Sequence, residues 1–271
     1  MSEFPWAEFA GSVPFTLAAV VAVLGVTYMI ALRVGKHAVV DVAWGAGFVA
    51  VAVTSYAVST ISAEDANGGR RLLVTVLTAL WGLRLANHIW MRSRGHGEDP
   101  RYEALLAKAK GSPRLFALTR IYLTQGLLMW FISLPVQVAA FETAPLGILA
   151  WVGVTLWVVG FVFETVGDRQ LQQFRDDPSN KGGVLDSGLW RYTRHPNYFG
   201  DACVWWGLSL IAFSAWPGIL TILSPLLMTW LLAKGTGKPL MEKGLSSRPG
   251  YEAYVRRTSG FVPLPPKRSI T

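Results

Sequence analysis

The sequence predicts an all-α membrane protein, a bundle of about seven transmembrane helices that forms a single domain over residues 1–271. Three observations support this fold class. Hydrophobic residues make up 52% of the chain and charged residues only 15%, which is too apolar for an ordinary soluble domain. Apolar runs long enough to cross a bilayer recur along the chain. Basic residues are distributed unevenly among the segments between these runs.

The apolar runs give the expected helices in order. The first five have roughly 18 or more residues, the length of a transmembrane helix, and two shorter runs follow. They lie at about 14–33, 38–58, 71–91, 120–141, 146–167, 199–215 and 217–233. Tyr251 to Arg257 predicts a short helix in the C-terminal tail. Glu3 and Glu8 occupy the N-terminus without a basic segment, which argues against a cleaved signal peptide.

The basic residues indicate the orientation of the bundle. The chain has 25 Lys and Arg residues. Apart from Arg70, Arg71 and Arg84, they follow the first, third and fifth apolar runs or lie in the tail. The positive-inside rule therefore places the N-terminus outside and the C-terminus in the cytoplasm. Topology and contact with anionic lipids account for the net charge of +8, so we expect no nucleic-acid partner.

The segment from Glu164 to Gly207 is rich in polar residues although apolar runs flank it. Ionisable groups at membrane depth are costly and are therefore functional candidates. Glu164, Asp168 and Arg175 recur at helical spacing, so they share one face of a helix that ends before Asp177-Pro178. A loop and the string GLWRYTRHPNY follow. The pattern predicts a site for a highly charged cofactor at the cytoplasmic surface.

Each type of side chain in this segment suits one part of such a cofactor. Arginine binds phosphate oxygens in pairs, lysine acts as a point charge, amides and carboxylates hold hydroxyls or amides, and tyrosine stacks on a flat ring. The candidates in this order are Arg175, Arg191 and Arg194, then Lys181, then Asn197 and Asp201, then Tyr192 and Tyr198. The alternative is a basic collar that binds lipid headgroups. It explains the cations but leaves the interleaved acids and Asn197 without a role.

The early apolar runs carry a second polar group. Asp41 lies in the run AVVDVAWG, where a carboxylate needs a partner or a raised pKa. It is either a structural hydrogen-bond partner of Arg84 or a functional residue, which donates a proton or makes a hydrogen bond to the polar head of a substrate. Arg84 and His88 are four residues apart and face the same way. We therefore take Asp41, Arg84 and His88 as candidate catalytic residues.

Other polar residues lie at the ends of these runs. Glu98, Asp99, Arg101 and Tyr102 either order a lid over the cofactor or cap a short helix. Gln125 is a polar residue near the start of the fourth apolar run. The sequence contains no GxGxxG, Walker A, HExxH or GxSxG motif, and its single cysteine, Cys203, excludes an internal disulfide and a cysteine-based metal site.

The strings GDRQLQQFRDDP and GLWRYTRHPNYFGD resemble the bacterial branch of the steroid 5-alpha-reductase superfamily, and the similarity extends from DVAWG to the tail. Members of that superfamily are seven-helix membrane proteins that bind NADPH among their C-terminal helices and reduce carbon–carbon double bonds. The resemblance implies that residues 164–271 form the cofactor-binding part. It places NADPH contacts at Asp168, Arg175, Asn197 and Asp201, with Arg191, Tyr192, Arg194, His195 and Tyr198 in the same motif.

The resemblance also carries expectations about chemistry and location. Eukaryotic members pair a catalytic Glu of the second helix with a Tyr of the third. Asp41 lies in a similar place, but the third run has no Tyr, only Arg84, Asn87 and His88. An apolar partner, a steroid enone or an unsaturated lipid, is the expected substrate. The bacterial plasma membrane is the expected location, with the cofactor site facing the cytoplasm.

Two alternatives remain open from the sequence. RYTRHPNYFG also resembles the RHPxYxG motif of isoprenylcysteine and phospholipid methyltransferases, which use S-adenosylmethionine. The GDRQLQQFRDDP helix and the larger number of helices favour the reductase. A non-catalytic lipid or sterol binder would explain why the third run lacks a Tyr.

Overall fold

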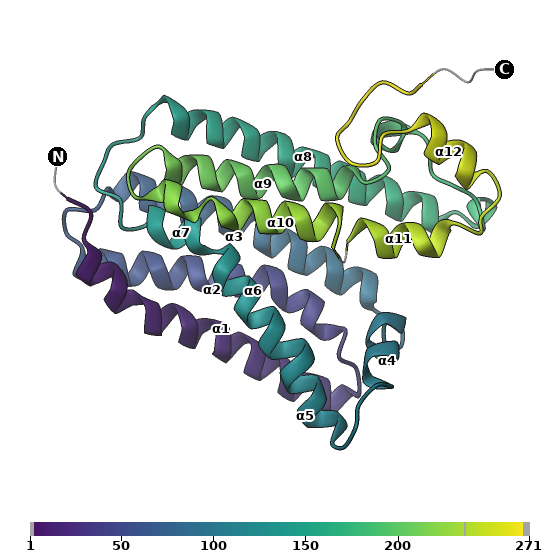
Figure 1. Cartoon of the computed structure of the whole chain (residues 1–271), viewed down its shortest axis with the longest axis horizontal. Helices are drawn as coiled ribbons and strands as arrows, with labels where there is room; N and C mark the ends of the chain where they lie inside the picture. The colour runs from purple at the N-terminus through teal and green to yellow at the C-terminus, as the bar shows by residue number, and fades with distance from the viewer. Residues whose placement is uncertain (1–2, 236, 268–271) are drawn as a thin grey trace. The chain divides into compact units, whose positions relative to one another are not determined.

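The structure, a computed structural model, describes residues 3–235 and 237–267. These residues are helical and contain no strand, only an isolated bridge between Thr193 and Ser259, which confirms the predicted all-α class. The α-helices are α1 (Trp6–Val34), α2 (Val39–Ser62), α3 (Gly68–Ser93), α4 (Pro100–Leu106), α5 (Pro113–Ala117), α6 (Thr124–Ile132), α7 (Leu134–Ala139), α8 (Ile148–Asp176), α9 (Pro196–Phe213), α10 (Leu223–Ala233), α11 (Lys238–Leu245) and α12 (Tyr251–Arg257) (Figure 1). Short helical turns are η1 (Leu118–Leu123), η2 (Pro178–Asn180), η3 (Gly188–Arg191) and η4 (Gly218–Thr221).

Six helical segments among the described residues are long and apolar enough to cross a membrane, as an integral membrane protein requires. They are α1, α2, α3, Pro113–Ile132, α8 and Gly218–Leu245. The sequence predicts about seven. The difference is the run at 199–215, which becomes α9 and falls outside the six, because Asn197 and Asp201 make its first turns polar. The predicted orientation of the termini stays a prediction.

The chain divides into two compact units. Unit 1 comprises Met1–Leu149 and Ile211–Ser224, and unit 2 comprises Ala150–Leu210 and Pro225–Thr271. Each unit has its own polar cluster. The predicted single domain over the whole chain stays a prediction.

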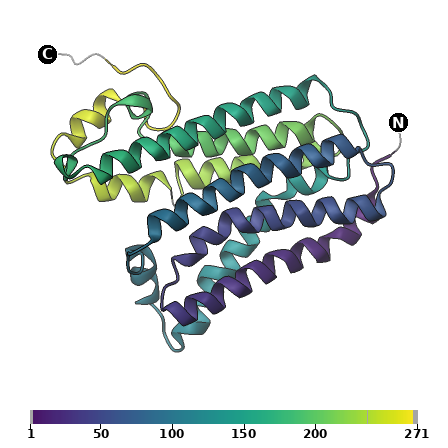
Figure 2. The same ribbon diagram turned by 180° about the vertical axis from the view of Figure 1, so that it is seen from behind.

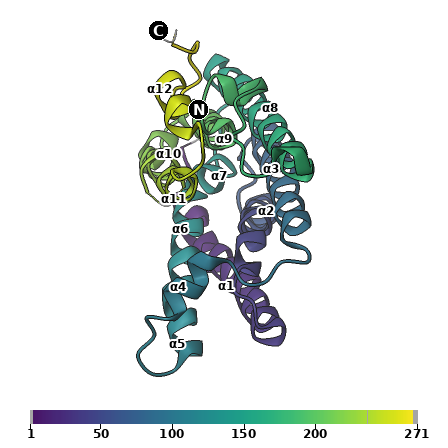
Figure 3. The same cartoon turned by 90° about the vertical axis from the view of Figure 1, so that its right-hand side faces the viewer.

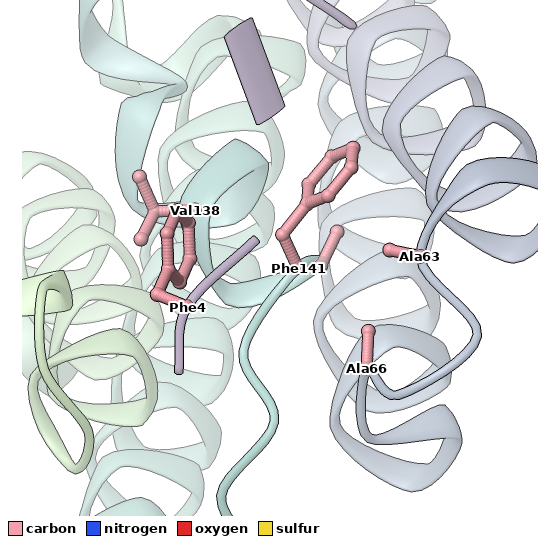
Figure 4. Close-up of a cluster of buried hydrophobic side chains, with 6 residues drawn as sticks. Phe4, Ala63, Ala66, Val138 and Phe141 are labelled. Atoms are coloured by element: carbon pink, nitrogen blue, oxygen red, sulfur yellow. The ribbon is translucent and has the colours of Figure 1, made fainter. Parts of the chain in front are cut away.

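In unit 1, α1, α2 and α3 lie side by side (Figure 2). A cluster of buried apolar residues closes one end of this unit, where Phe4 before α1 and Phe141 after α7 pack with Ala63, Ala66 and Val138 (Figure 4). Phe9 joins the cluster edge-to-face with Phe141, at 5.7 Å between ring centroids. These contacts fix α1 and α7 against the connection from α2 to α3.

The closest approach of α2 and α3 is at two glycines. A Cβ added to Gly45 would lie 2.1 Å from the carbonyl oxygen of Gly82, and one added to Gly82 would lie 2.6 Å from the carbonyl oxygen of Gly45. Small residues allow helix backbones to approach in this way. Gly45 stands one helical turn after Asp41, so this contact also positions the candidate catalytic carboxylate.

We expect Gly45→Ala to destabilise unit 1, because the new methyl group forces two backbones apart. Overpacking of this kind costs about 1–3 kcal/mol, which should lower the melting temperature of the detergent-solubilised protein by several degrees. Gly25→Ala is the matched control, since a Cβ on this α1 glycine meets nothing within 4 Å. Equal melting temperatures for the two variants would contradict the close packing of α2 on α3.

Arg70 is buried at the start of α3, although the sequence suggests only a charge in an outer loop. Its guanidinium donates to the hydroxyl of Ser214 at 2.6 Å and to the carbonyls of Pro145 at 2.8 Å and Ala144 at 3.2 Å. Glu142 is also buried. Burial raises the pKa of Glu142 to about 7, and the charge of Arg70 offsets only part of this effect.

Glu142 should therefore make stability depend on pH. In the unfolded chain it ionises near its ordinary pKa of 4.5, whereas the folded protein keeps it protonated up to about 7. A raised folded pKa of an acid favours folding most below the unfolded pKa, and this contribution is lost as pH rises to about 7. We expect Glu142→Gln to flatten the fall in melting temperature across that range. Parallel profiles for the variant and the wild type would refute this role.

In unit 2, α8, α9 and α10 are neighbours (Figures 1 and 3). α9 lies against α8 through glycines: a Cβ on Gly200 would lie 2.5 Å from the carbonyl oxygen of Gly160, and one on Gly207 would lie 2.6 Å from that of Gly153. The indole of Trp206 donates to the hydroxyl of Thr229 at 3.0 Å and joins α9 to α10. The close contact of α8 with α9 brings together polar residues of both helices. These residues lie at the helix ends that are predicted to face the cytoplasm.

Candidate functional site

The first polar cluster, in unit 1, is built around Asp41 in the first turn of α2. The hydroxyl of Tyr102 donates to Oδ1 of Asp41 at 2.5 Å, and Arg101 donates to Oδ2 at 2.9 Å. The amide of Gln125 donates to the hydroxyl of Tyr102 at 3.0 Å, and the indole of Trp44 donates to the amide oxygen of Gln125. Trp44, Gln125, Tyr102 and Asp41 thus form one directed chain of hydrogen bonds that ends at a carboxylate.

The segment before α4 determines where Tyr102 lies. The carboxylate of Glu98 accepts the backbone N–H groups of His37 and Ala38, just before α2. Asp99 caps α4 by accepting the backbone N–H of Arg101 at 2.8 Å, with Pro100 in the first turn. The predicted cap is therefore confirmed, whereas the lid stays a prediction. The chain that leaves α3 is tied back to the start of α2.

The electrostatics of this cluster keep a proton on Tyr102. Burial, and next the charge of Asp41, raise the pKa of Tyr102 well above its ordinary value. Hydrogen bonds from Arg101 hold the pKa of Asp99 below its ordinary value, and both bonds of the Arg101 guanidinium to Asp99 measure 2.9 Å. Tyr102, only 8% exposed, therefore stays a neutral hydrogen-bond donor at physiological pH.

Arg84 and His88, the other two predicted catalytic residues, are half-buried on α3 one turn apart. The hydrogen bonds to Asp41 described above come from Arg101 and Tyr102 of α4. The alternative of a structural Asp41–Arg84 pair stays open. The catalytic roles of Arg84 and His88 stay predictions.

Tyr102 is the residue that sequence reasoning undervalued. The resemblance implies a phenol on the third helix as the partner of Asp41, whereas Tyr102 lies beyond that helix, in α4. The signal in the sequence is Asp99-Pro100, a helix start that turns the chain back and places Tyr102 in the first turn of the new helix.

The second cluster, in unit 2, joins two predicted cofactor-binding residues. Nδ2 of Asn197, at the start of α9, donates to Oδ1 of Asp168 on α8 at 3.0 Å. Oδ1 of Asn197 accepts the backbone N–H of Tyr198, also at 3.0 Å. Asp168 is buried, and so is Asp201 one turn further along α9. Gly167 allows this contact, since a Cβ there would lie 3.2 Å from the backbone nitrogen of Asn197.

Four further predicted cofactor contacts lie on the surface of unit 2. Arg175 is exposed in the last turn of α8, and Lys181 and Arg191 are exposed in the segment between α8 and α9. Tyr192 is 45% exposed. These side chains can meet a ligand from solvent without a rearrangement of the helices.

Arg194 and His195, by contrast, hold the C-terminal segments in place. Arg194 donates to Glu242 on α11 at 2.8 Å and to the carbonyl of Thr258, after α12, at 2.7 Å. Nε2 of His195 lies 3.2 Å from Glu242, and its ring stacks on Tyr198 at 5.3 Å between centroids. Burial lowers the pKa of His195 to about 4 despite Glu242, so the ring is neutral at physiological pH. Cofactor contact by these residues stays a prediction.

Comparison with known proteins adds a family and one relative. A family model described as "Protein of unknown function (DUF1295)" matches residues 27–258, which include both polar clusters. An uncharacterized protein of Schizosaccharomyces pombe is 24% identical over an alignment that covers 72% of this chain. The chain spans 63% of the length of that relative. No solved structure matches the chain.

Proposed function

We propose that this chain, a member of the DUF1295 family of proteins of unknown function, is a membrane oxidoreductase. In this proposal it uses NADPH to reduce a carbon–carbon double bond of an apolar substrate. The proposal rests on the two polar clusters described above. The observation that carries the proposal is the hydrogen-bonded chain from Gln125 through Tyr102 to Asp41. The likeness of residues 167–178 and 188–201 to the steroid 5-alpha-reductase superfamily supports the same activity.

The donor groups of unit 2 fit the proposed cofactor. Exposed Arg175, Lys181 and Arg191 supply positive charge for phosphates, and Arg binds phosphate oxygens in pairs. The Asp168–Asn197 pair, of which Asp168 is buried, supplies a carboxylate and an amide. These are the groups that hold hydroxyls and amides. NADPH, when bound, would supply the hydride. The residues named here would bind and orient it.

The cluster in unit 1 fits the proton-donation step of the reaction. Reduction of a conjugated enone places negative charge on the carbonyl oxygen, and a positioned hydrogen-bond donor stabilises that charge. Tyr102 holds a proton that it now shares with Asp41, and a carbonyl oxygen would replace Asp41 as its acceptor. The N–H of Gln125 directed at the phenol oxygen stabilises the charge that develops there as the proton leaves.

The reaction itself tests this proposal. Detergent-purified protein is incubated with NADPH and a panel of conjugated enones, both 3-oxo-Δ4 steroids and unsaturated lipid ketones, and the products are identified by mass spectrometry. We expect one class to gain two hydrogens as NADPH is oxidised. Transfer of a labelled methyl group from S-adenosylmethionine to lipid, without NADPH oxidation, would instead assign methyltransferase activity, which the string RHPNYFG also matches.

A further inference from the structure

Unit 2 contains a pocket of which the proposed function uses only Arg191. It has a volume of about 570 Å³ and is lined by Asp186, Ser187 and Gly188, by Arg191 at the end of η3, by Arg257 at the end of α12, and by Lys267 in the tail. Three cations thus face one carboxylate. Of these residues only Gly188 and Arg191 stand in the motifs discussed above.

Hydrogen bonds hold the walls of this pocket. The backbone N–H of Leu189 donates to the side chain of Gln170 on α8 at 3.0 Å. Gly188 has φ +58°, and a Cβ there would lie 2.3 Å from the amide nitrogen of Gln170. On the opposite side, the hydroxyl of Tyr254 donates to the carbonyl of Trp190 at 2.6 Å. The pocket is therefore a built feature of α8, η3 and α12.

The C-terminal tail and an ion pair between Arg257 and Asp186 complete the wall of the pocket. The backbone N–H of Lys267 donates to the carbonyl of Arg257 at 2.9 Å, which fixes the backbone of the tail beside α12. The guanidinium of Arg257 pairs with Asp186 through one nitrogen. Asp186 thereby orients the fork of Arg257 and neutralises one of the three positive charges. Arg191 and Lys267 remain exposed to solvent on the rim.

The charge and size of the pocket define its ligand. An excess of two positive charges matches the dianion of a phosphomonoester, and Arg with Lys is the usual pair of side chains for a terminal phosphate. The Ser187 side chain makes no capping bond to η3 and adds a hydroxyl to the lining. A volume of about 570 Å³ lies within the range of small-molecule sites and exceeds the size of phosphate alone.

We infer that this pocket binds a phosphomonoester carried on a larger molecule, through Arg191, Arg257 and Lys267. The assignment of that group to the 2′-phosphate of NADPH rests on the proposed function. It gives the chain a physical basis for choosing NADPH over NADH. A lipid with a phosphomonoester headgroup presents the same chemistry from the membrane surface.

Two nucleotides that differ in a single phosphomonoester test the inference. The affinities of adenosine 2′,5′-bisphosphate and adenosine 5′-monophosphate are measured by calorimetry on the full-length protein in detergent. We expect the wild type to bind the bisphosphate at least tenfold more tightly. Arg191→Gln combined with Lys267→Gln should remove this preference. Lys243→Gln on α11, an exposed cation outside the pocket, should keep the preference.

The outcomes separate this inference from the proposed function. Tight binding of NADPH and NADH with equal affinity would overturn the 2′-phosphate site while the reductase proposal stands. If neither NADPH nor NADH binds, binding of the protein to a phosphomonoester lipid tests the pocket independently, in nanodiscs with and without phosphatidate. Binding to phosphatidate that the double variant loses would assign the site to a lipid headgroup. Failure to bind both phosphatidate and the bisphosphate, or a preference that the double variant retains, would refute the phosphomonoester site.

Discussion

Tyr102→Phe should lower the turnover of enone reduction by about 10²–10⁴-fold, the usual contribution of a general acid. The variant keeps the aromatic ring in its buried position but removes the hydroxyl that joins Gln125 to Asp41. Turnover should fall far more than the Michaelis constant changes, because the lost hydrogen bond acts on charge that develops only in the transition state. NADPH binding should be unaffected, since Tyr102 is not among the residues proposed to hold it.

Tyr122→Phe is the matched control for Tyr102. Both tyrosines are buried in unit 1, but the hydroxyl of Tyr122 contacts His37, at 3.3 Å, and takes no part in the chain to Asp41. We expect this control to retain activity. Asp41→Asn should cost less than Tyr102→Phe, because in the proposed step a carbonyl oxygen takes the place of Asp41 as the acceptor of the Tyr102 proton. Full activity in Tyr102→Phe would exclude the phenol as the proton donor.

Arg175→Ala should weaken NADPH binding by about ten- to a hundredfold, because a charge-assisted hydrogen bond contributes roughly 1.5–3 kcal/mol. Arg175 is exposed at the end of α8, so its removal should leave the melting temperature of the free protein unchanged. The measurement is the shift of melting temperature with NADPH concentration.

Arg169→Ala controls for the loss of a cation from the same helix. Arg169 is also exposed on α8, but six residues before Arg175, and therefore on a different face. We expect its variant to bind NADPH as the wild type does. Equal weakening in the two variants would point to a general effect of charge at this surface, and undiminished binding in Arg175→Ala would remove Arg175 from the cofactor site.

Much of the fold follows from the sequence because long apolar runs leave few alternatives in a membrane. The break at Asp177-Pro178 and the tail helix Tyr251–Arg257 are where the pattern predicts them. Arg70 shows the limit: the positive-inside rule counts it as a loop charge, but the structure buries it against carbonyls at the ends of other segments. Such partners lie more than 70 residues away in the chain, and no local pattern indicates them.

The residues of the candidate site also fall into those that the sequence predicts and those that it does not. Asp168 and Asn197 are predicted separately from helical spacing and motif, and the structure brings them into contact. Tyr102 and Lys267 escape prediction as site residues because their positions depend on segments that fold back, onto α2 in one case and onto α12 in the other. Arg194 has the side chain that a phosphate site needs, but Glu242, which binds it, is distant in sequence.

A single titration tests the central claim most directly. Detergent-purified protein is titrated in parallel with NADPH, NADH and S-adenosylmethionine, and binding is followed by the shift in melting temperature. The proposed function predicts saturable stabilisation by NADPH, weaker stabilisation by NADH and none by S-adenosylmethionine. Stabilisation by S-adenosylmethionine alone would contradict it in favour of methyl transfer, and no stabilisation by any of the three would favour a lipid-binding protein without catalytic activity.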